Sequence, residues 1–297
     1  MPAVQPPNAF ITETLAQYTP RAATYDVSNG GWHVELGRDH VTWLPPPKGG
    51  AVLDLACGTG LVALPYAEAV GPDGTVVGVD VTEAMLSEAK RKPLADGSGE
   101  VHWVLGDIMD VSSLDAVQEV IRARGGFDII SCCSAFVLLE NPAKALDDWV
   151  ALLKPGTGRL ILDVPTEDRT LQYLLNYPLR KALGKAMTYD FDWIEDIHTV
   201  EKMFEEANLD IVKSFRTRSY TSERWYDAGQ AAEVLEQKTR ESGLWKGVIE
   251  DWKSEDGPAG ADKIKELWAQ IWKENLNEKG KLWDGHALYV TVGRRRE

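Results

Sequence analysis

The stretch Ala51-Val-Leu-Asp-Leu-Ala-Cys-Gly-Thr-Gly60 decides the fold of this chain. Its apolar run, residues 52–55, is typical of a buried strand in a parallel sheet. Gly58 and Gly60 lie in the turn that follows, and residues 61–70 favour a helix. Small residues let the backbone approach a ligand closely, and a helix N-terminus offers free N–H groups. The stretch therefore predicts a strand–turn–helix unit with a nucleotide-type site.

Two nucleotide-type ligands are considered for this site, a dinucleotide and S-adenosylmethionine. A dinucleotide fingerprint needs three glycines as G-x-G-x-x-G, and here no third glycine follows Gly58 and Gly60. Asp54 precedes the turn, and a carboxylate is a poor neighbour for a pyrophosphate and a good one for a cation. S-adenosylmethionine carries a sulfonium and an α-ammonium and no phosphate. The acidic strand end therefore favours S-adenosylmethionine over NAD.

Residues 52–60 resemble motif I of the class I S-adenosylmethionine-dependent methyltransferases. The order of the predicted elements is similar to that family from about Gly50 to Pro165, from about His198 to Tyr220, and at the last strand. The resemblance implies a methyltransferase with S-adenosyl-L-methionine as cofactor. It also implies a Rossmann-like sheet of strand order 3-2-1-4-5-7-6 that closes with an antiparallel pair.

Strands and helices are predicted to alternate along the middle of the chain, which indicates a doubly wound α/β fold with a parallel sheet. The expected strands are 51–56, 75–81, 101–105, 127–132, 159–164, 210–220 and 286–292. The expected helices are 60–70, 83–92, 112–124, 142–153 and 198–208.

Three segments outside this alternation predict a helical cap. The first, residues 10–44, reads as helix, turn, helix. In the second, residues 166–197, leucines recur at the helical spacing i, i+3, i+4. The third, residues 222–282, contains an apolar helical stripe from Ile264 to Trp272. The predicted organisation is a cap segment at 1–45, a cofactor-binding core at 46–165, a cap insertion at 166–197, a core helix and strand at 198–221, a helical cap insertion at 222–283, and a last strand and tail at 284–297.

The composition excludes some functions. The 297 residues carry a formal net charge of −14, which argues against nucleic acid as a partner, because phosphate contacts need a basic face. No run of eighteen apolar residues and no N-terminal signal pattern is present, so we expect no membrane partner. An odd count of three cysteines without framework spacing indicates a reducing compartment, and we expect a cytoplasmic protein. The oligomeric state is not readable.

The expected cofactor site lies at the carboxyl ends of the strands. Asp80 ends the second strand, where its carboxylate can accept hydrogen bonds from both ribose hydroxyls. The resemblance implies that Asp107 binds the adenine amino group and that the Ile108 N–H binds a ring nitrogen. Met85 either covers the adenine or belongs to the core. The full predicted set is Asp54, Ala56, Cys57, Gly58, Gly60, Asp80, Val81, Met85, Gly106, Asp107, Ile108, Cys132, Cys133 and Ser134.

Methyl transfer is an in-line displacement that depends mainly on proximity and orientation. A base is needed only where the acceptor must lose a proton. His33 is the candidate base and Tyr25 the second catalytic candidate, with a structural role open for His33. We expect no metal site and no thiol catalysis, because the cysteines lack metal-ligand spacing and have no neighbouring histidine in sequence.

The predicted reaction is methyl transfer to oxygen or nitrogen of an apolar or aromatic small molecule of natural-product type. The tryptophan-rich segments suggest an aromatic pocket, since six of eleven tryptophans follow residue 220. Three alternatives stay open: another reaction on the same cofactor fold, a non-catalytic scaffold protein with a residual cofactor site, and an NAD-type oxidoreductase.

Overall fold

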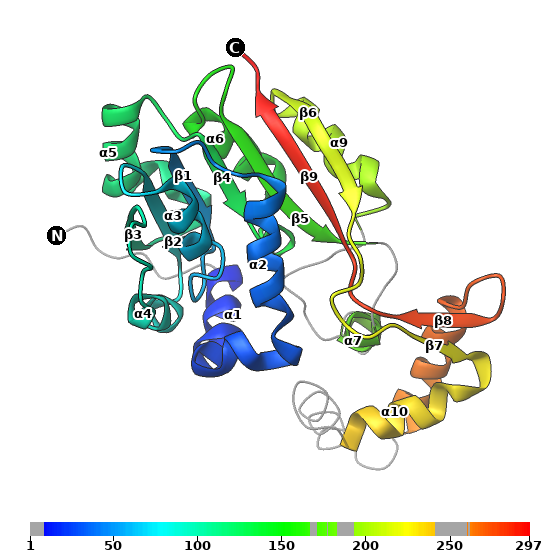
Figure 1. Cartoon of the computed structure of the whole chain (residues 1–297). Helices are drawn as coiled ribbons and strands as arrows, with labels where there is room; N and C mark the ends of the chain where they lie inside the picture. Colours follow the sequence, from blue (N-terminus) through cyan, green and yellow to red (C-terminus); the bar gives the residue numbers. More distant parts are fainter. Residues whose placement is uncertain (1–8, 167–170, 177, 183–192, 241–259, 261) are drawn as a thin grey trace. The chain divides into compact units, whose positions relative to one another are not determined.

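The computed structural model describes residues 9–166, 171–176, 178–182, 193–240, 260 and 262–297. Within them the chain divides into two compact units (Figure 1). The first unit consists of Met1–Thr166, Phe191–Thr217 and Leu288–Glu297, and the second of Glu167–Asp190 and Arg218–Ala287. Each unit is described by itself.

A seven-stranded sheet forms the centre of the first unit, in the order β3-β2-β1-β4-β5-β9-β6. The strands are β1 (Ala51–Leu55), β2 (Thr75–Asp80), β3 (Glu100–Leu105), β4 (Ile129–Cys132), β5 (Arg159–Pro165), β6 (Leu209–Arg216) and β9 (Leu288–Arg295). The first five run parallel, and β9 lies antiparallel to both β5 and β6. Because β9 is the seventh strand of this sheet along the chain, the predicted order 3-2-1-4-5-7-6 is confirmed.

Helices cover both faces of this sheet (Figure 1). The helices of the first unit are α1 (Ala9–Tyr18), η1 (Thr19–Gly31), α2 (Trp32–Trp43), α3 (Ala63–Val70), α4 (Glu83–Arg91), η2 (Ile108–Ser113), α5 (Asp115–Arg124), η3 (Phe136–Leu138), α6 (Pro142–Leu152) and α9 (Ile197–Glu206). The helix predicted to start at residue 60 begins at Ala63, because the glycine turn continues to Val62. The helix, turn, helix expected over 10–44 is present with a longer middle part, since the 3-10 helix η1 connects α1 to α2 and Gly31 precedes α2 with a left-handed φ of 72°.

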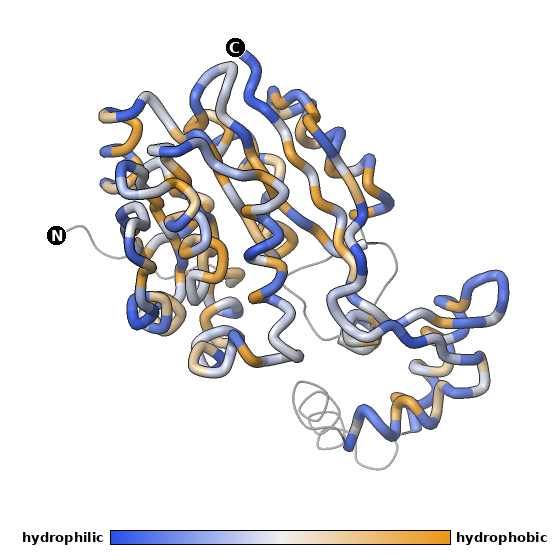
Figure 2. The backbone as a smooth tube through the Cα atoms, viewed as in Figure 1, coloured by the Kyte–Doolittle hydropathy of each residue, from blue (hydrophilic) through white to orange (hydrophobic). Residues whose placement is uncertain are grey.

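The alternating side chains of the strands form two apolar cores, one on each face of the sheet. Val52 and Ile129 belong to the cluster that includes α3, whereas Leu53 and Ile130 belong to the cluster that includes α5 and α6. Successive side chains of a strand point to opposite faces, so a strand buried on both faces is mostly apolar along its length, with Asp54 in β1 and Ser131 in β4 as buried exceptions. Figure 2 shows the apolar colouring along these central strands.

The second unit has its own small core and corrects one expectation. It contains α7 (Leu171–Asn176), α8 (Pro178–Ala182), η4 (Ala228–Gln230), α10 (Ala231–Arg240) and a helix over 262–274. The segment expected to be wholly helical also forms an antiparallel ribbon of β7 (Arg224–Asp227) and β8 (Lys281–Asp284). The ribbon places Tyr226 and Leu282 in a cluster with Trp268 and Trp272.

The ends of two strands also differ from the prediction. The strand expected at 210–220 stops at Arg216, and the last strand starts at Leu288 rather than at His286. The two segments that form β6 and β9 remain paired beyond the strand ends through irregular hydrogen bonds. For example, the Tyr220 N–H donates to the His286 carbonyl. The covering role of the predicted cap segments stays a prediction.

Candidate active site

The larger pocket of the first unit lies at the carboxyl ends of β1, β2 and β4. It encloses about 860 Å³ including the open solvent at its mouth. The strand ends, with the turns and helix starts that follow them, contribute Ala56, Gly58, Asp80, Val81, Thr82, Met85, Gly106, Asp107, Ile108, Met109, Cys133, Ser134 and Ala135. The N-terminal helices and η3 with its following turn contribute Phe10, Ile11, Thr14, Tyr18, Tyr25, Leu138, Leu139 and Glu140.

The glycine turn forms the floor of this pocket. Gly58 has a φ of 53°, and a side chain placed there would meet no protein atom within 4 Å. The space beside its backbone is therefore open to a ligand. Gly60, at φ 83°, serves packing instead, because a Cβ there would lie 2.7 Å from the Trp103 ring. The two glycines of the turn thus have different roles.

Asp80 ties the glycine turn to the start of α4. Its carboxylate accepts hydrogen bonds from the Gly58 N–H at 2.8 Å and, through its other oxygen, from the Thr82 N–H at 2.8 Å. Burial raises the pKa of Asp80, and these backbone donors oppose the rise. Each oxygen retains acceptor capacity, so the geometry is suited to two hydroxyl groups of a ligand in the pocket.

A smaller pocket adjoins the same turn, and Asp54 lies in its wall. Asp54 is 1% exposed, and one of its oxygens accepts the Ala63 N–H. Within the described residues the other oxygen has no hydrogen-bond partner. Burial raises the pKa of Asp54 well above its usual value, and the negative charge of Asp80 raises it further. A buried carboxylate of this kind favours a cationic ligand, which fits the α-ammonium of S-adenosylmethionine.

The N-terminal segment is fastened across the glycine turn. Asp26 of η1 accepts a hydrogen bond from the Thr59 hydroxyl at 2.5 Å and pairs with Lys92 at 2.5 Å. The neighbouring Tyr25 lines both pockets. Its ring lies 4.6 Å from that of His33, which lines the smaller pocket and stacks on Trp32. Burial raises the pKa of Tyr25 well above its usual value, so its hydroxyl stays protonated at neutral pH.

Comparison with known proteins decides the family. Residues 52–156 match a methyltransferase-domain model. The demethylmenaquinone methyltransferase of Geobacillus kaustophilus is 38% identical over 191 residues, which are 60% of this chain and 78% of that protein. The chain belongs to the class I S-adenosylmethionine-dependent methyltransferases. The family implies S-adenosyl-L-methionine as cofactor, and the pocket residues described above suit it.

Two further proteins show the range of similarity to this methyltransferase. The nocamycin O-methyltransferase of Saccharothrix syringae is 30% identical over 159 residues, and the match spans 54% of this chain and about half, 53%, of that relative. The magnesium protoporphyrin IX methyltransferase of Synechocystis PCC 6803 has the same fold, with a TM-score of 0.50 at 17% identity, over 72% of this chain and 93% of that one.

The two pockets bring together most of the residues predicted for the methyltransferase's cofactor site. Those in the larger pocket alone are Asp80, Val81, Met85, Gly106, Asp107 and Ile108, those in the smaller alone are Asp54 and Cys57, and those in both are Ala56, Gly58, Cys133 and Ser134. Gly60 and Cys132 line neither, within the described residues. Cys132 faces the buried core because strand alternation points it away from Cys133. Direct contact of these residues with the cofactor stays a prediction.

The structure brings the two catalytic candidates together, with their rings 4.6 Å apart. Tyr25 lines both pockets, whereas His33 lines only the smaller one, together with Asp54. Burial raises the pKa of Cys133 well above its usual value, and nearby Asp163 adds to the rise, so the thiol is protonated at neutral pH. Neither the cysteine pair nor its pKa supports thiol catalysis.

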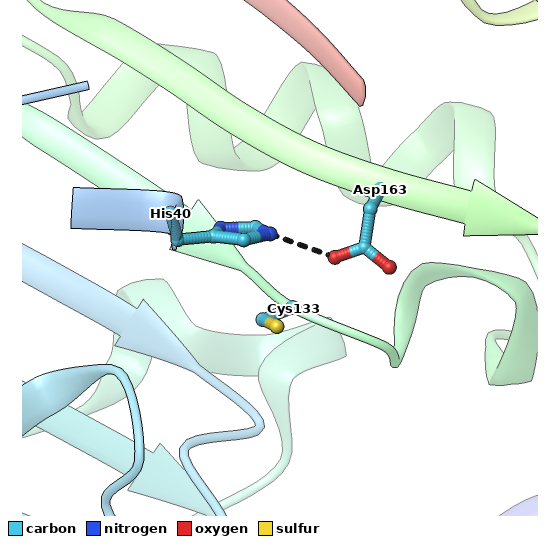
Figure 3. Close-up of side chains that lie close together, drawn as sticks. All are labelled: His40, Cys133 and Asp163. Carbon is cyan, nitrogen blue, oxygen red and sulfur yellow. Dashed lines mark hydrogen bonds and ion pairs between the residues drawn. The ribbon is translucent and has the colours of Figure 1, made fainter. Parts of the chain in front are cut away.

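Sequence reasoning missed two groups of pocket residues in this methyltransferase. The apolar wall of Phe10, Ile11, Leu138 and Leu139 has no motif, and only the folded chain joins its parts. A buried cluster of His40, Cys133 and Asp163 lies beside the pockets (Figure 3). The distance of His40 from the other two along the chain left no local signal. No helix among the described residues is long and apolar enough to cross a membrane.

The buried carboxyl of Asp54 leads to a pH prediction. Because its folded-state pKa is raised, the folded protein retains a proton that the unfolded chain loses near pH 4. Its contribution to stability is therefore present at low pH and lost as the pH rises towards the folded-state pKa. The slope is up to about 1.4 kcal/mol per pH unit.

Asp54→Asn should remove this component, so the free energy of unfolding of the ligand-free variant should exceed that of the wild type increasingly above pH 4. Urea unfolding at several pH values measures the difference. The same variant should bind S-adenosylhomocysteine more weakly, since an amide replaces the acceptor for the ammonium. Parallel stability curves for the two proteins would contradict the prediction.

Proposed function

We propose that this protein transfers a methyl group from S-adenosyl-L-methionine to an oxygen or nitrogen atom of an apolar or aromatic small molecule. One observation carries the proposal: the larger pocket joins the acidic strand ends to an apolar wall. The strand ends contribute Asp80 and Asp107, and the wall contributes Phe10, Leu138 and Leu139. A cofactor and an apolar acceptor can therefore share one cavity.

The charge of the lining supports an acceptor without a phosphate or carboxylate group. Among the described residues, the larger pocket has the acids Asp80, Asp107 and Glu140 and neither lysine nor arginine. An anionic acceptor would meet like charge and no cation. Relatives are named for small molecules, nocamycin and demethylmenaquinone among them, which supports a small-molecule acceptor.

The chain's own residues would position the reaction. When bound, the cofactor supplies a methyl group activated by its sulfonium. Asp54 would hold the ammonium, Asp80 the ribose, and the apolar wall would exclude water and orient the acceptor. Binding the two reactants side by side is the main source of rate in an in-line transfer.

The two catalytic candidates would have different tasks. Tyr25 would donate a hydrogen bond rather than accept a proton, because its pKa is raised by burial. His33, whose ring lies beside that of Tyr25, would act as base for a hydroxyl acceptor. An amine acceptor with a free lone pair needs no base.

The test is methyl transfer from labelled cofactor to a panel of phenols, quinols, aromatic amines and aliphatic alcohols. We expect label on a phenol or amine and none on phosphorylated acceptors. With a phenol, His33→Gln should lower kcat by roughly 10²–10⁴ and leave the Kd for S-adenosylhomocysteine within threefold.

The possible outcomes separate several interpretations. Equal losses of affinity and turnover would place His33 in the cofactor site and reject its role as base. Label bound to carbon would reject the oxygen or nitrogen assignment. Tight cofactor binding without transfer to any panel member or to a cell extract would favour another reaction on the same fold.

A further inference from the structure

The cluster beside the pockets is a closed hydrogen-bond network rather than a set of free ligands. His40 is fully buried in α2, and its Nε2 lies 2.8 Å from Oδ2 of Asp163, as Figure 3 shows. Its Nδ1 lies 3.3 Å from the Ser131 hydroxyl in β4. A carboxylate only accepts hydrogen bonds, so Nε2 carries the hydrogen. Both ring nitrogens are thus occupied by protein groups.

Asp163 extends this network to the wall of the pockets. The last pair between β4 and β5 is Cys132 with Leu162, so Asp163 lies beside the turn that follows β4. Its two oxygens accept the Ser134 N–H at 3.2 and 3.0 Å. Asp163 is 1% exposed, and loss of its partners would leave a buried carboxylate unsatisfied.

The turn held in this way has an unfavourable backbone conformation. Ser134 has a φ of 54°, which lies in the left-handed region that residues other than glycine seldom adopt. Such a conformation persists where the surrounding structure determines it. Cys133 and Ser134 both line the larger and the smaller pocket. The position of this turn therefore shapes both pockets at once.

We infer that His40 and Asp163 are positioning residues that hold the turn after β4 in the shape required for cofactor and acceptor binding. The inference rests on the proposed function, since Cys133 and Ser134 of this turn line both pockets of that site. His40 acts through Asp163, and Asp163 acts through the Ser134 N–H. The network also fastens α2, whose first turn carries His33, to the sheet.

Substitutions of His40 test this inference with a matched control. In His40→Gln the side-chain amide N–H can take the position of Nε2 and donate to Asp163. The shorter side chain of His40→Asn extends only to Ser131, and that of His40→Ala contacts neither Asp163 nor Ser131. Tyr66→Phe is the control, because the Tyr66 hydroxyl bonds the His40 and Leu44 carbonyls of the same buried region without contacting Asp163 or Ser134.

Two measurements are expected to move together. Calorimetry with S-adenosylhomocysteine should show about tenfold weaker binding for His40→Ala and His40→Asn, and binding within threefold of wild type for His40→Gln and Tyr66→Phe. A misplacement of about 1 Å at a site can cost up to about 10²-fold. Hydrogen exchange of the Ser134 amide, measured without ligand, should accelerate in the same two variants only.

The results that would reject this inference differ from the results that would reject the proposed function. Unchanged Ser134 exchange and unchanged affinity in His40→Asn would make the network a plain core contact, and this variant decides the matter if His40→Ala does not fold. Stoichiometric zinc binding that is lost in Cys133→Ser would overturn it in favour of a metal site. A wild-type protein without affinity for S-adenosylhomocysteine would reject the proposed function, while the exchange measurement would still test the network.

Discussion

Asp80→Ala is expected to weaken the binding of S-adenosylhomocysteine by about 10- to 150-fold. The substitution removes the acceptor of the Gly58 and Thr82 N–H groups and the predicted acceptor of the ribose hydroxyls. Hydrogen bonds to a charged group contribute roughly 1.5–3 kcal/mol, and each 1.4 kcal/mol is a tenfold change in Kd. Isothermal calorimetry on the folded variant measures the effect.

The control for Asp80→Ala removes a carboxylate outside the site. Asp96 is exposed in the turn after α4, so Asp96→Ala should leave the affinity unchanged. Asp80→Asn retains one acceptor oxygen, so its affinity for S-adenosylhomocysteine should lie between those of the wild type and of Asp80→Ala. An Asp80→Ala variant that binds as tightly as the control would reject the ribose role of Asp80.

Trp149→Ala is expected to lower the free energy of unfolding by roughly 3–5 kcal/mol, the range for truncating a buried tryptophan. Trp149 in α6 is fully buried, packs against Phe136 and donates a hydrogen bond from Nε1 to the Ile108 carbonyl at 2.8 Å. Alanine leaves a cavity and an unsatisfied carbonyl directly below the pocket. Urea unfolding followed by far-UV circular dichroism measures the loss.

Two variants separate the causes of this loss. Trp149→Phe retains much of the ring volume and loses the hydrogen bond, so it should lower the free energy of unfolding by less than Trp149→Ala does. Leu105→Ala, at a side chain 54% exposed in the edge strand β3, should change stability by no more than about 0.5 kcal/mol. If Trp149→Ala and Leu105→Ala destabilised the protein equally, Trp149 would not support the core as inferred.

The sequence alone determined the sheet and the floor of the site. A strand buried on both faces is mostly apolar along its length, so residues 52–55, apart from Asp54, and residues 76–79 predict strands without further context. The left-handed Gly58 and the acids at the strand ends are local features, and a parallel sheet brings its carboxyl ends to one edge. The fold class therefore followed from local patterns, whereas the family and the strand order followed from the resemblance of one motif to class I methyltransferases.

Short elements outside the sheet could not be predicted in the same way. The ribbon strands β7 and β8 have four residues each and pair across more than fifty positions. Four residues carry too little alternation to separate a strand from a loop or from the helical pattern around it. Pairing at that distance is decided by burial of Tyr226 and Leu282 in the core of the second unit.

Only the tertiary structure decided which side chains meet around the pockets. His40 and Asp163 are 123 residues apart, and their contact depends on how α2 packs against β4 and β5. Cys132 and Cys133 are adjacent in sequence, yet one lies in the core and the other faces the pockets, because a strand alternates its faces. Local patterns set secondary structure through backbone geometry and hydrophobic period, whereas the neighbours of a polar side chain depend on packing between distant segments, which no local pattern records.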